Sequence, residues 1–366
     1  MRHSLIVIQM LPALNNGGVE RGTVEMANYL VEQGHTSIVI SAAGGAMLKK
    51  LSKKVEHINL NIGKKSFVTL LLIKKLQKIF IEKKADIIHA RSRLPAWLAF
   101  KAIAKIKTNK PKFITTVHGL YSVKKYSSIM ARGDKVITVS QTATNYIKNN
   151  YSKHLKSEPC LINRGIDIKE FPYNHEPEVA WLKAFYEKNT HLKGCKLVLL
   201  PGRLTALKGV KELIVWLKNQ DNGAKLVLTA DPDNDTYAAK LSHWFEQQGV
   251  ENKIVWVGLQ TNMAELYALV DVVVNTSIRP ESFGRTVAES LAIGTPVVAY
   301  NHGGAGEILN RIFPQGQVAV YDQQHLSDTI NNMLYSAHRI SNKQPFILSE
   351  MLQNTLGLYQ EILNES

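Results

Sequence analysis

Short apolar segments alternate with helix-like segments along almost the whole chain, and this alternation limits the fold more than any other feature. In the first half, strands are expected at 5–10, 36–42, 86–90, 112–119 and 135–141. Helical patterns occupy 17–35, 67–85 and 94–106. Because the expected strands are rich in Val, Ile and Leu with no regular polar face, we predict a parallel sheet covered by helices on both faces.

The second half repeats the same alternation. Strands are expected at 196–202, 224–230, 253–258 and 271–277, and helices at 210–219, 236–249 and 262–270. The join near 160–195 is irregular and contains Pro172 and Pro177. A length of 366 residues suits two domains. We therefore predict an α/β protein with two doubly wound, Rossmann-like domains, 1–165 and 166–345, which bind ligands at the carboxyl ends of their strands, facing a cleft.

Charge is distributed unevenly over these two halves. The chain has 45 Lys and Arg against 30 Asp and Glu, a net charge of +15. Residues 1–165 hold 28 of the basic and 8 of the acidic side chains, a net +20, and the remainder is −5. Such a field suits nucleic acid, anionic lipid or a phosphorylated sugar. Nucleic-acid binding would require aromatic platforms among the basic residues or a recognition helix, and we find neither pattern.

The segment "MRHSLIVIQM" passes directly into the first expected strand and does not resemble a secretory signal. No stretch reaches the ~18 continuous apolar residues of a spanning helix. Cys160 and Cys195 are the only cysteines, without metal-type spacing around them, so structural thiols are expected. These features predict a cytoplasmic protein that meets a membrane only at its surface.

Two loops after expected strands contain groups that suit phosphate. "NNGGVERG" (15–22) is rich in glycine and opens a helix, so the backbone at Gly18 could approach a phosphate, although the same residues also suit a tight turn. "PGRLTALKG" (201–209) places Arg203 and Lys208 on one loop. Two cations there suit a diphosphate, but a solvated loop is the alternative.

The stretch "RPESFGRTVAESLAIGTPVVAYNHGGAGEIL" spans residues 279–309. It predicts Glu281 in a loop, Glu289 inside a helix of about ten residues, and a helix end at Gly294. A glycine-rich loop is expected at 303–306, after the next apolar run. Glu289 taken alone is better explained as a solvated helix residue.

Together and in this order, "GGVERG", "PGRLTALKG", "VWVG", "AELYALVDVVVNTS" and the 279–309 stretch resemble the retaining GT-B glycosyltransferases of family 4, the glycogen-synthase-like and lipopolysaccharide-type group. The mark of that family is Glu-x7-Glu, matched by Glu281 and Glu289. The resemblance covers most of the chain and is strongest over 197–310. It implies a GT-B fold in which the last helix, within 346–366, crosses back to the first domain.

The resemblance also implies roles for individual residues. Glu281 would contact the hydroxyls of the donor sugar and act as a catalytic residue. Glu289 would bind the ribose of the nucleotide, and Arg203 with Lys208 would hold the diphosphate. The expected substrate is a nucleotide sugar, with UDP as the expected nucleotide and no cofactor or metal.

Four further residues follow from the same resemblance. Gly18 would bring its backbone to the phosphates, and Phe283 with Gly284 would lie at the donor. His118, which ends "ITTVHG", matches the family's histidine near the reacting face of the sugar, although a lone histidine there is usually structural. Transfer with retention is expected, in which the leaving phosphate accepts the proton of the acceptor.

Two departures from the family pattern bear on these roles. Where the family often has Asn-Gly-Val-Asp before the linker, this chain has "NRGID", with Arg164 inserted. "TADPDN" (229–234) replaces the glycine pair of a loop that lies near the nucleobase in the family. The second departure leaves the base open.

The basic first domain is the expected acceptor side. The apolar helix at 67–84 includes Lys74, Lys75 and Lys78, and such a helix can lie on an anionic membrane. We expect a glycolipid or oligosaccharide acceptor of the lipopolysaccharide-core type and a peripheral position at the inner membrane. An ordinary helix with solvated lysines, a soluble acceptor, and a sugar-nucleotide epimerase or phosphorylase of the same architecture are the alternatives.

Overall fold

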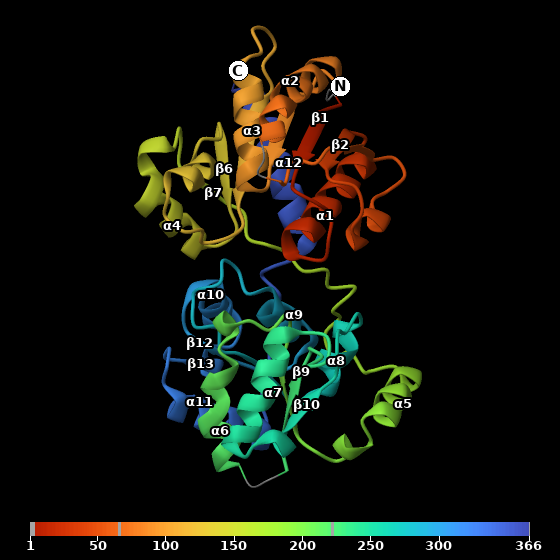
Figure 1. Cartoon of the computed structure of the whole chain (residues 1–366), viewed down its shortest axis with the longest axis vertical. Coiled ribbons are helices and arrows are strands. Elements are labelled where there is room, and N and C mark those ends of the chain that lie inside the picture. Colours follow the sequence, from red (N-terminus) through yellow and green to blue (C-terminus); the bar gives the residue numbers. More distant parts are fainter. Residues whose placement is uncertain (1–3, 65–66, 221–222, 366) are drawn as a thin grey trace. The chain divides into compact units, whose positions relative to one another are not determined.

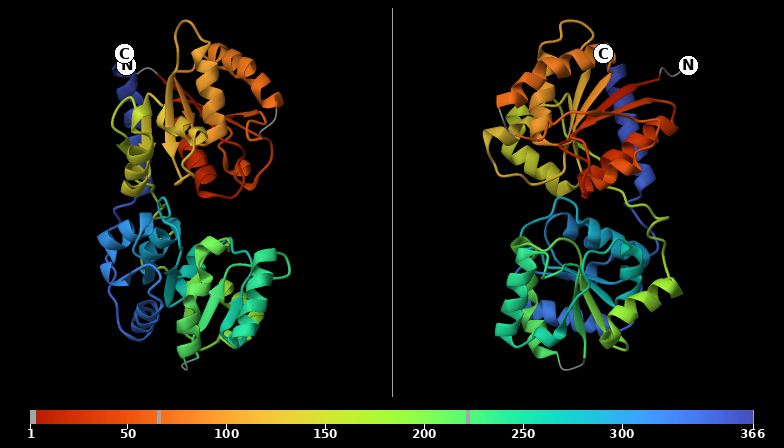
Figure 2. Two further views of the ribbon diagram at one scale, coloured as in Figure 1. Left: turned by 60° about the vertical axis from the view of Figure 1, so that its left-hand side comes forward. Right: turned by 45° about the vertical axis from the view of Figure 1, so that its right-hand side comes forward.

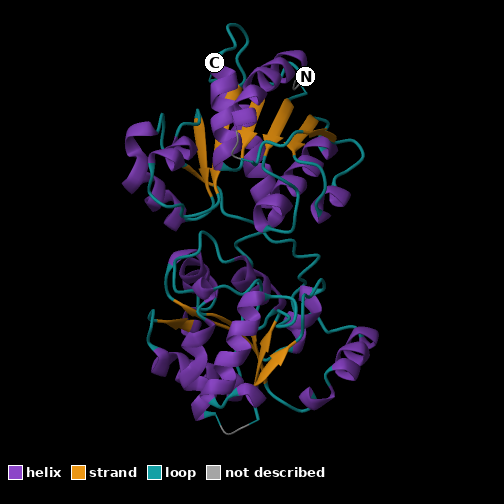
Figure 3. Cartoon of the chain, in the orientation of Figure 1, coloured by secondary structure: helices purple, strands orange, loops and turns teal. Residues whose placement is uncertain are grey.

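The computed structural model describes residues 4–64, 67–220 and 223–365, which fall into two compact units (Figure 1). The first unit comprises Met1–Arg164 and Ser349–Ser366, and the second comprises Gly165–Leu348. Each unit is built on one parallel sheet with helices packed against it (Figure 3). The predicted α/β class with two doubly wound sheets is confirmed.

In the first unit, the described strands follow the order β3-β2-β1-β4-β5-β6-β7, with all neighbours parallel. The strands are β1 (Ile6–Met10), β2 (Thr36–Ser41), β3 (Glu56–Asn59), β4 (Ile87–Ala90), β5 (Lys112–Val117), β6 (Lys135–Thr138) and β7 (Cys160–Leu161). The helices are α1 (Gly18–Glu32), α2 (Phe67–Glu82), α3 (Arg93–Ala104), α4 (Gln141–Tyr151) and α12 (Leu348–Asn364). The central strands are buried because both faces of the sheet are covered.

Helix α12 returns from the end of the chain to the first unit, as predicted (Figure 2). Tyr359 on α12 is fully buried, and its hydroxyl lies 2.6 Å from Nδ1 of His89 on β4. The other ring nitrogen of His89 lies 2.6 Å from the hydroxyl of Thr116 on β5. Burial, followed by the charge of Arg91, holds the pKa of His89 well below its usual value, so a neutral ring links three elements.

In the second unit, the described strands follow the order β10-β9-β8-β11-β12-β13, again all parallel. The strands are β8 (Leu197–Leu200), β9 (Lys225–Leu228), β10 (Ile254–Trp256), β11 (Val272–Asn275), β12 (Val297–Tyr300) and β13 (Gln317–Val318). The helices are α5 (Val179–Lys188), α6 (Ile214–Asn219), α7 (Thr236–Gln248), α8 (Met263–Leu269), α9 (Arg285–Ile293), α10 (Gly303–Ile312) and α11 (Gln323–Tyr335). Three-residue 3-10 helices, such as Ala206–Lys208, occupy several loops.

Helix α9 ends as its sequence predicts. Gly294 adopts a left-handed conformation with φ of +100°, and its N–H donates to the carbonyl of Leu291. The expected loop at 303–306 is wrong, however, because α10 begins at Gly303. Glycine has a low helix propensity, so a Gly-Gly start predicts a loop unless a tertiary contact requires the small residues.

Across the residues that the structure describes, we find no helix that combines the length and the apolar character needed to cross a membrane.

Candidate functional site

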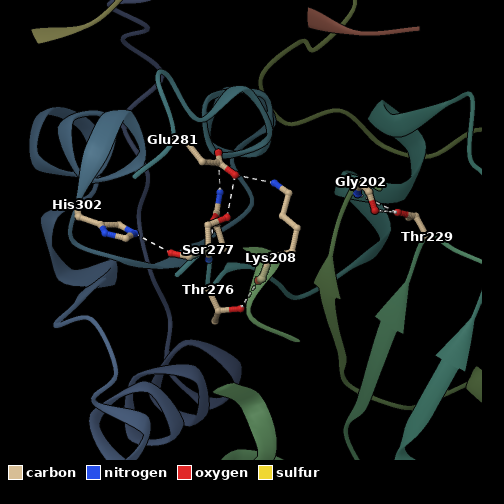
Figure 4. A network of polar contacts seen from close by, with 8 residues as sticks. Gly202, Lys208, Thr229, Thr276, Ser277, Glu281 and His302 are labelled. Carbon is tan, nitrogen blue, oxygen red and sulfur yellow. Dashed lines mark hydrogen bonds and ion pairs between the residues drawn. The ribbon is translucent and has the colours of Figure 1, made fainter. Parts of the chain in front are cut away.

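Glu281 lies in the loop between β11 and α9, where several polar groups converge on its carboxylate (Figure 4). Lys208 Nζ lies 2.6 Å from Oε1, and the Ser277 hydroxyl donates to the same oxygen at 2.8 Å. Asn275 Nδ2 donates to Oε2 at 3.3 Å. Asn275 and Ser277 stand at the end of β11, and Lys208 stands on the loop after β8, so neighbouring parallel strands bring them together.

The carboxylate of Glu281 is held in its ionised form. Burial alone would raise its pKa, but the charge of Lys208 and the hydrogen bonds from Lys208, Ser277 and Asn275 lower it below the usual value. The group is therefore a negatively charged acceptor at neutral pH. It can accept hydrogen bonds from sugar hydroxyls on its remaining lone pairs.

The loop that holds Lys208 is fixed to the end of β11. The hydroxyl of Thr276 donates to the carbonyls of Lys208 and Gly209, at 3.0 and 2.9 Å. Gly209 has φ of +64°, and a Cβ at this position would collide with the carbonyl oxygen of Thr276. Only glycine fits there, and the close approach of the backbones places Lys208 beside Glu281.

Arg203, predicted to share the diphosphate with Lys208, lies outside this cluster. Its side chain is exposed and lines an open groove of about 440 Å³ together with residues 234–237, at the start of α7. Asp235 caps that helix by accepting from the N–H groups of Tyr237 and Ala238. Within the described part of the chain, Arg203 forms no ion pair, so the structure joins Lys208, but not Arg203, to Glu281.

Glu289 lies inside α9 and is only 6% exposed. Arg285 Nε donates to its Oε1 at 2.6 Å, and the hydroxyl of Tyr267 donates to its Oε2 at 3.2 Å. Burial, followed by the charge of Glu289, raises the pKa of Tyr267 well above its usual value, so this hydroxyl stays protonated and donates. The carboxylate therefore has a fixed orientation, with lone pairs left for a ligand.

Apart from Lys208, the sequence did not indicate the residues that contact the two glutamates. Arg285 precedes Glu289 by four residues, and this helical spacing is a signal that could have identified the pair. Tyr267, Asn275 and Ser277 had no comparable signal, because their contacts depend on the packing of α8, α9 and β11.

Phe283 and Gly284 connect the Glu281 loop to its neighbours. The Phe283 ring is 5% exposed and packs edge-on against Phe346, with ring centroids 5.5 Å apart. The expected contact of Phe283 with the donor is therefore limited to its backbone. Gly284, with φ of +93°, precedes the first turn of α9. The glycines of α10 pack onto this loop: Gly304 N–H donates to the Glu281 carbonyl at 2.8 Å, and a Cβ on Gly304 would overlap the Phe283 backbone.

The remaining predicted residues lie in the first unit. Gly18 is the first residue of α1. His118 follows β5, and its Nδ1 lies 3.2 Å from Nη1 of Arg164. Burial is the largest cause that holds the pKa of His118 well below its usual value, followed by the charges of Arg164 and Arg91. The exposed lysines on α2 are Lys74, Lys75 and Lys78.

Among the described residues, no three His, Cys, Asp or Glu side chains gather where they could hold a metal ion. Two doubly wound parallel sheets, with charged side chains at the carboxyl ends of their strands, define a class of two-domain α/β proteins that bind ligands at those strand ends.

Comparison with known proteins identifies the family within that class. The model of "Glycosyltransferase Family 4" matches residues 16–170, and that of "Glycosyl transferases group 1" matches residues 183–344. A crystal structure of a glycosyltransferase from Rickettsia africae is 30% identical, with all of both chains covered and a TM-score of 0.86. The chain belongs to the group 1 glycosyltransferases of GT-B fold, and it is a transferase, as predicted.

Other relatives are more distant. An uncharacterised glycosyltransferase of Methanocaldococcus jannaschii is 28% identical over 257 residues, 64% of this chain and 62% of that protein, so the match spans less than two thirds of the relative. The Anabaena protein HepE, solved in complex with UDP-glucose, shares 19% identity over 99% of this chain and 100% of its own, with a TM-score of 0.76. At that identity the likeness shows the fold alone.

Proposed function

We propose that the protein transfers a sugar from a nucleotide-sugar donor, with retention of configuration, and that the carboxyl ends of β8 and β11 with the start of α9 form the donor site. The Lys208–Glu281 contact is the observation that supports this most strongly. It joins a cation suited to a diphosphate and an ionised carboxylate suited to sugar hydroxyls, which are adjacent parts of one nucleotide sugar.

In this proposal Glu281 accepts hydrogen bonds from the donor sugar, and Lys208 binds the diphosphate. Glu289, oriented by Arg285 and Tyr267, accepts from the ribose hydroxyls. Arg203 adds a second cation for the phosphates. Because its side chain is exposed, Arg203 can reach a ligand without breaking an existing ion pair.

Three further assignments rest on the family resemblance. The backbone N–H groups at the start of α9, after Phe283 and Gly284, face oxygen atoms of the donor. In the first unit, the backbone at Gly18 contacts the phosphates, and His118 serves the reacting sugar.

The chemical step balances without a metal or a protein nucleophile. The bond between the anomeric carbon and the diphosphate oxygen breaks, and the acceptor oxygen bonds to the same face of the sugar. The acceptor proton passes to the leaving phosphate, whose developing charge Lys208 and Arg203 stabilise. We propose UDP as the nucleotide, by analogy with HepE, which was solved with UDP-glucose.

We further propose that the acceptor is a glycolipid or oligosaccharide of the lipopolysaccharide-core type at the cytoplasmic face of the inner membrane. Support comes from α2, where Leu71 and Ile81 are 72% and 53% exposed beside Lys74, Lys75 and Lys78. Apolar side chains next to cations suit the interface of an anionic bilayer. A soluble anionic acceptor is the alternative.

A groove of about 1050 Å³ adjoins α2 on the side of Ile81. Its charge supports the proposal that this face meets an anionic acceptor or membrane. Its lysines are Lys84, Lys105, Lys107, Lys110 and Lys112. Asp86 is the acidic residue in its lining, and that carboxylate already accepts from the N–H of Ile6. The groove is therefore strongly cationic.

The donor assignment is tested by incubating the protein with UDP-, GDP- and ADP-sugars and measuring sugar release and binding. The proposal predicts slow hydrolysis of one nucleotide class, with the released sugar first appearing in the donor's own anomeric configuration. Conversion of the donor to an epimer would favour the epimerase alternative. A protein that binds none of these donors but binds oligonucleotides would contradict the proposal.

A further inference from the structure

Arg164, the residue that departs from the family pattern, lies against both residues assigned to the reaction in the first unit. It follows β7 and is only 6% exposed. Its Nη1 lies 3.2 Å from His118 Nδ1, and its Nη2 lies 4.0 Å from the position that a Cβ on Gly18 would occupy. One buried guanidinium therefore contacts the histidine and adjoins the first turn of α1.

The contact determines where the His118 proton resides. A guanidinium has only donors, so Arg164 must donate and His118 Nδ1 must accept. A neutral imidazole that accepts at Nδ1 carries its hydrogen on Nε2. Protonation would place a second hydrogen on Nδ1, directed at a cation, and this arrangement excludes the imidazolium.

The other groups around His118 act in the same direction. Arg91 follows β4, and its charge lowers the pKa of the His118 ring, after burial and Arg164. His89 on β4 is neutral and adds no negative charge. The hydroxyl of Tyr121 bonds to the His118 backbone, and burial raises its pKa to about 12, so it adds no negative charge. The other side chains lining this small pocket, from α1, β5–β7 and α12, are Met26, Thr116, Ile137, Val139, Ile162, Met351 and Thr355, and none is ionisable.

Gly22 shows that α1 is shaped around the guanidinium. Gly22 lies inside the helix, where alanine is ordinarily the more favourable residue. A Cβ on Gly22 would lie 2.5 Å from Arg164 Nη2 and 2.9 Å from its Cζ. A side chain at this position would displace Arg164 from His118.

From this arrangement we infer that Arg164 is a positioning residue that fixes His118 as a neutral ring with its proton on Nε2. In this state His118 serves the transfer as a hydrogen-bond donor and not as a base. The donor role rests on the proposed function, which places His118 at the reacting sugar, whereas the position of the His118 proton does not depend on it.

Ring nitrogen NMR of the full chain with 15N-labelled histidine tests whether Arg164 holds His118 neutral with its proton on Nε2. The His118 signals among the 12 histidines are identified by their loss in His118→Gln. In the wild type, His118 should remain neutral and protonated on Nε2 from about pH 5.5 to 8, where an ordinary histidine titrates. Arg164→Met should shift both ring signals and raise the pKa of His118.

Gly22→Ala should shift the ring signals in the same direction through a helix-favouring substitution, which keeps the test valid if Arg164→Met does not fold. Gly357→Ala on α12 is the matched control and should leave His118 unchanged. Among the described residues, beyond its chain neighbours and the backbone of its own helix, no atom lies within 4 Å of its Cβ position. Titration of His118 within this range in the wild type, or unchanged ring signals in both Arg164→Met and Gly22→Ala, would overturn the inference.

Turnover measurements test whether His118 acts in the transfer as a hydrogen-bond donor and not as a base. A Gln side chain presents an N–H near the position of Nε2 but cannot act as a base. His118→Gln should therefore keep kcat within about tenfold of the wild type, while His118→Phe should lose about a hundredfold or more. Equal losses in both would contradict the donor role. A wild type that transfers no sugar would instead contradict the proposed function, and the NMR result would then decide the role of Arg164 by itself.

Discussion

Lys208 and Glu281 form an ion pair in which each partner has a second proposed task. The Lys208 ammonium has three N–H donors, so one can stay on Glu281 while the others reach a diphosphate. The Glu281 carboxylate similarly keeps lone pairs for sugar hydroxyls. The ion pair thus prepares both groups for one ligand, because the two side chains are already in contact and the Glu281 carboxylate is already ionised before the donor arrives.

Replacing Lys208 with Met should destabilise the protein in a pH-dependent manner. The depressed pKa of Glu281 contributes stability above its usual value of 4.5, and this contribution is lost as the pH falls through the lower folded value. In Lys208→Met, burial remains without the cation, so the pKa of Glu281 rises. We expect a loss of about 1–2 kcal/mol in the free energy of unfolding at pH 7.

Denaturant unfolding at pH 7 and at pH 4 measures this effect. The difference between wild type and Lys208→Met should shrink at pH 4, because Glu281 becomes protonated in the variant. A difference that is the same at both values would show that Lys208 stabilises the loop by packing and not by its charge.

Substitution of the two proposed phosphate-binding residues, Arg203 and Lys208, should lower kcat/KM to different extents. Arg203→Ala and Lys208→Ala should each lower kcat/KM more than tenfold, since each loses stabilisation of the developing phosphate charge. Lys208→Ala should lose more, because Glu281 loses its partner too. Steady-state kinetics with the preferred donor checks this, and near-normal kcat/KM in either variant would remove that residue from the phosphate site.

At the scale of elements, the sequence predicted most of the buried strands and most of the amphipathic helices. It missed β3, a short strand of mixed exposure with sequence "EHIN", and α4, which begins after the Ser140 cap with a polar sequence. It also missed α11, and α5, which lies in the join that was expected to be irregular. Local patterns are weak in such elements, and tertiary pairing decides their structure. The roles of the two glutamates were predicted from the family resemblance, and Lys208 was already indicated by the cationic loop at 201–209. The positions of Tyr267, Asn275 and Ser277 could not be found because they depend on packing between elements.

The glycine pair that opens α10 was predicted as a loop for a related reason. Propensity disfavours glycine in a helix, but the approach of α10 to the Glu281 loop leaves no room for a Cβ. Gly304→Ala should therefore cost about 2–3 kcal/mol of unfolding free energy, as a backbone displacement in a packed region does.

The same substitution should also weaken donor binding, because the Glu281 carbonyl accepts from the N–H of Gly304. Calorimetric melting of Gly304→Ala and Gly357→Ala provides the comparison. Gly357→Ala, on an open helix face, should leave stability unchanged or slightly raised. If both variants melt at the wild-type temperature, the close approach at Gly304 does not constrain the loop.

At the scale of the molecule, the +20 net charge of residues 1–165 contrasts with −5 for the rest. Each lysine near an anionic surface contributes about 1 kcal/mol, and the attraction decays over a Debye length of about 10 Å at 0.1 M salt. The protein should cosediment with anionic vesicles, bind neutral ones weakly and dissociate at high salt.

Substitution of Lys74, Lys75 and Lys78 by Glu should reduce this binding while nucleotide binding stays intact. The triple substitution of Lys49, Lys50 and Lys153, also exposed, changes the net charge equally and should reduce binding less. Equal loss in the two triple variants would assign the attraction to net charge and not to α2. Equal binding to neutral and anionic vesicles would rule out the electrostatic account.

The central claim, that the second unit holds the nucleotide-sugar site around Glu281 and Glu289, is tested most directly by calorimetric titration of the preferred nucleotide into the wild type and Glu289→Ala. Loss of a charged hydrogen bond costs about 1.5–3 kcal/mol, so Glu289→Ala should bind about 10- to 150-fold more weakly. Glu187→Ala, on the exposed side of α5, serves as the control and should bind like the wild type. If folded Glu289→Ala binds the nucleotide with unchanged affinity, this carboxylate does not contact the ribose and the proposed site is contradicted.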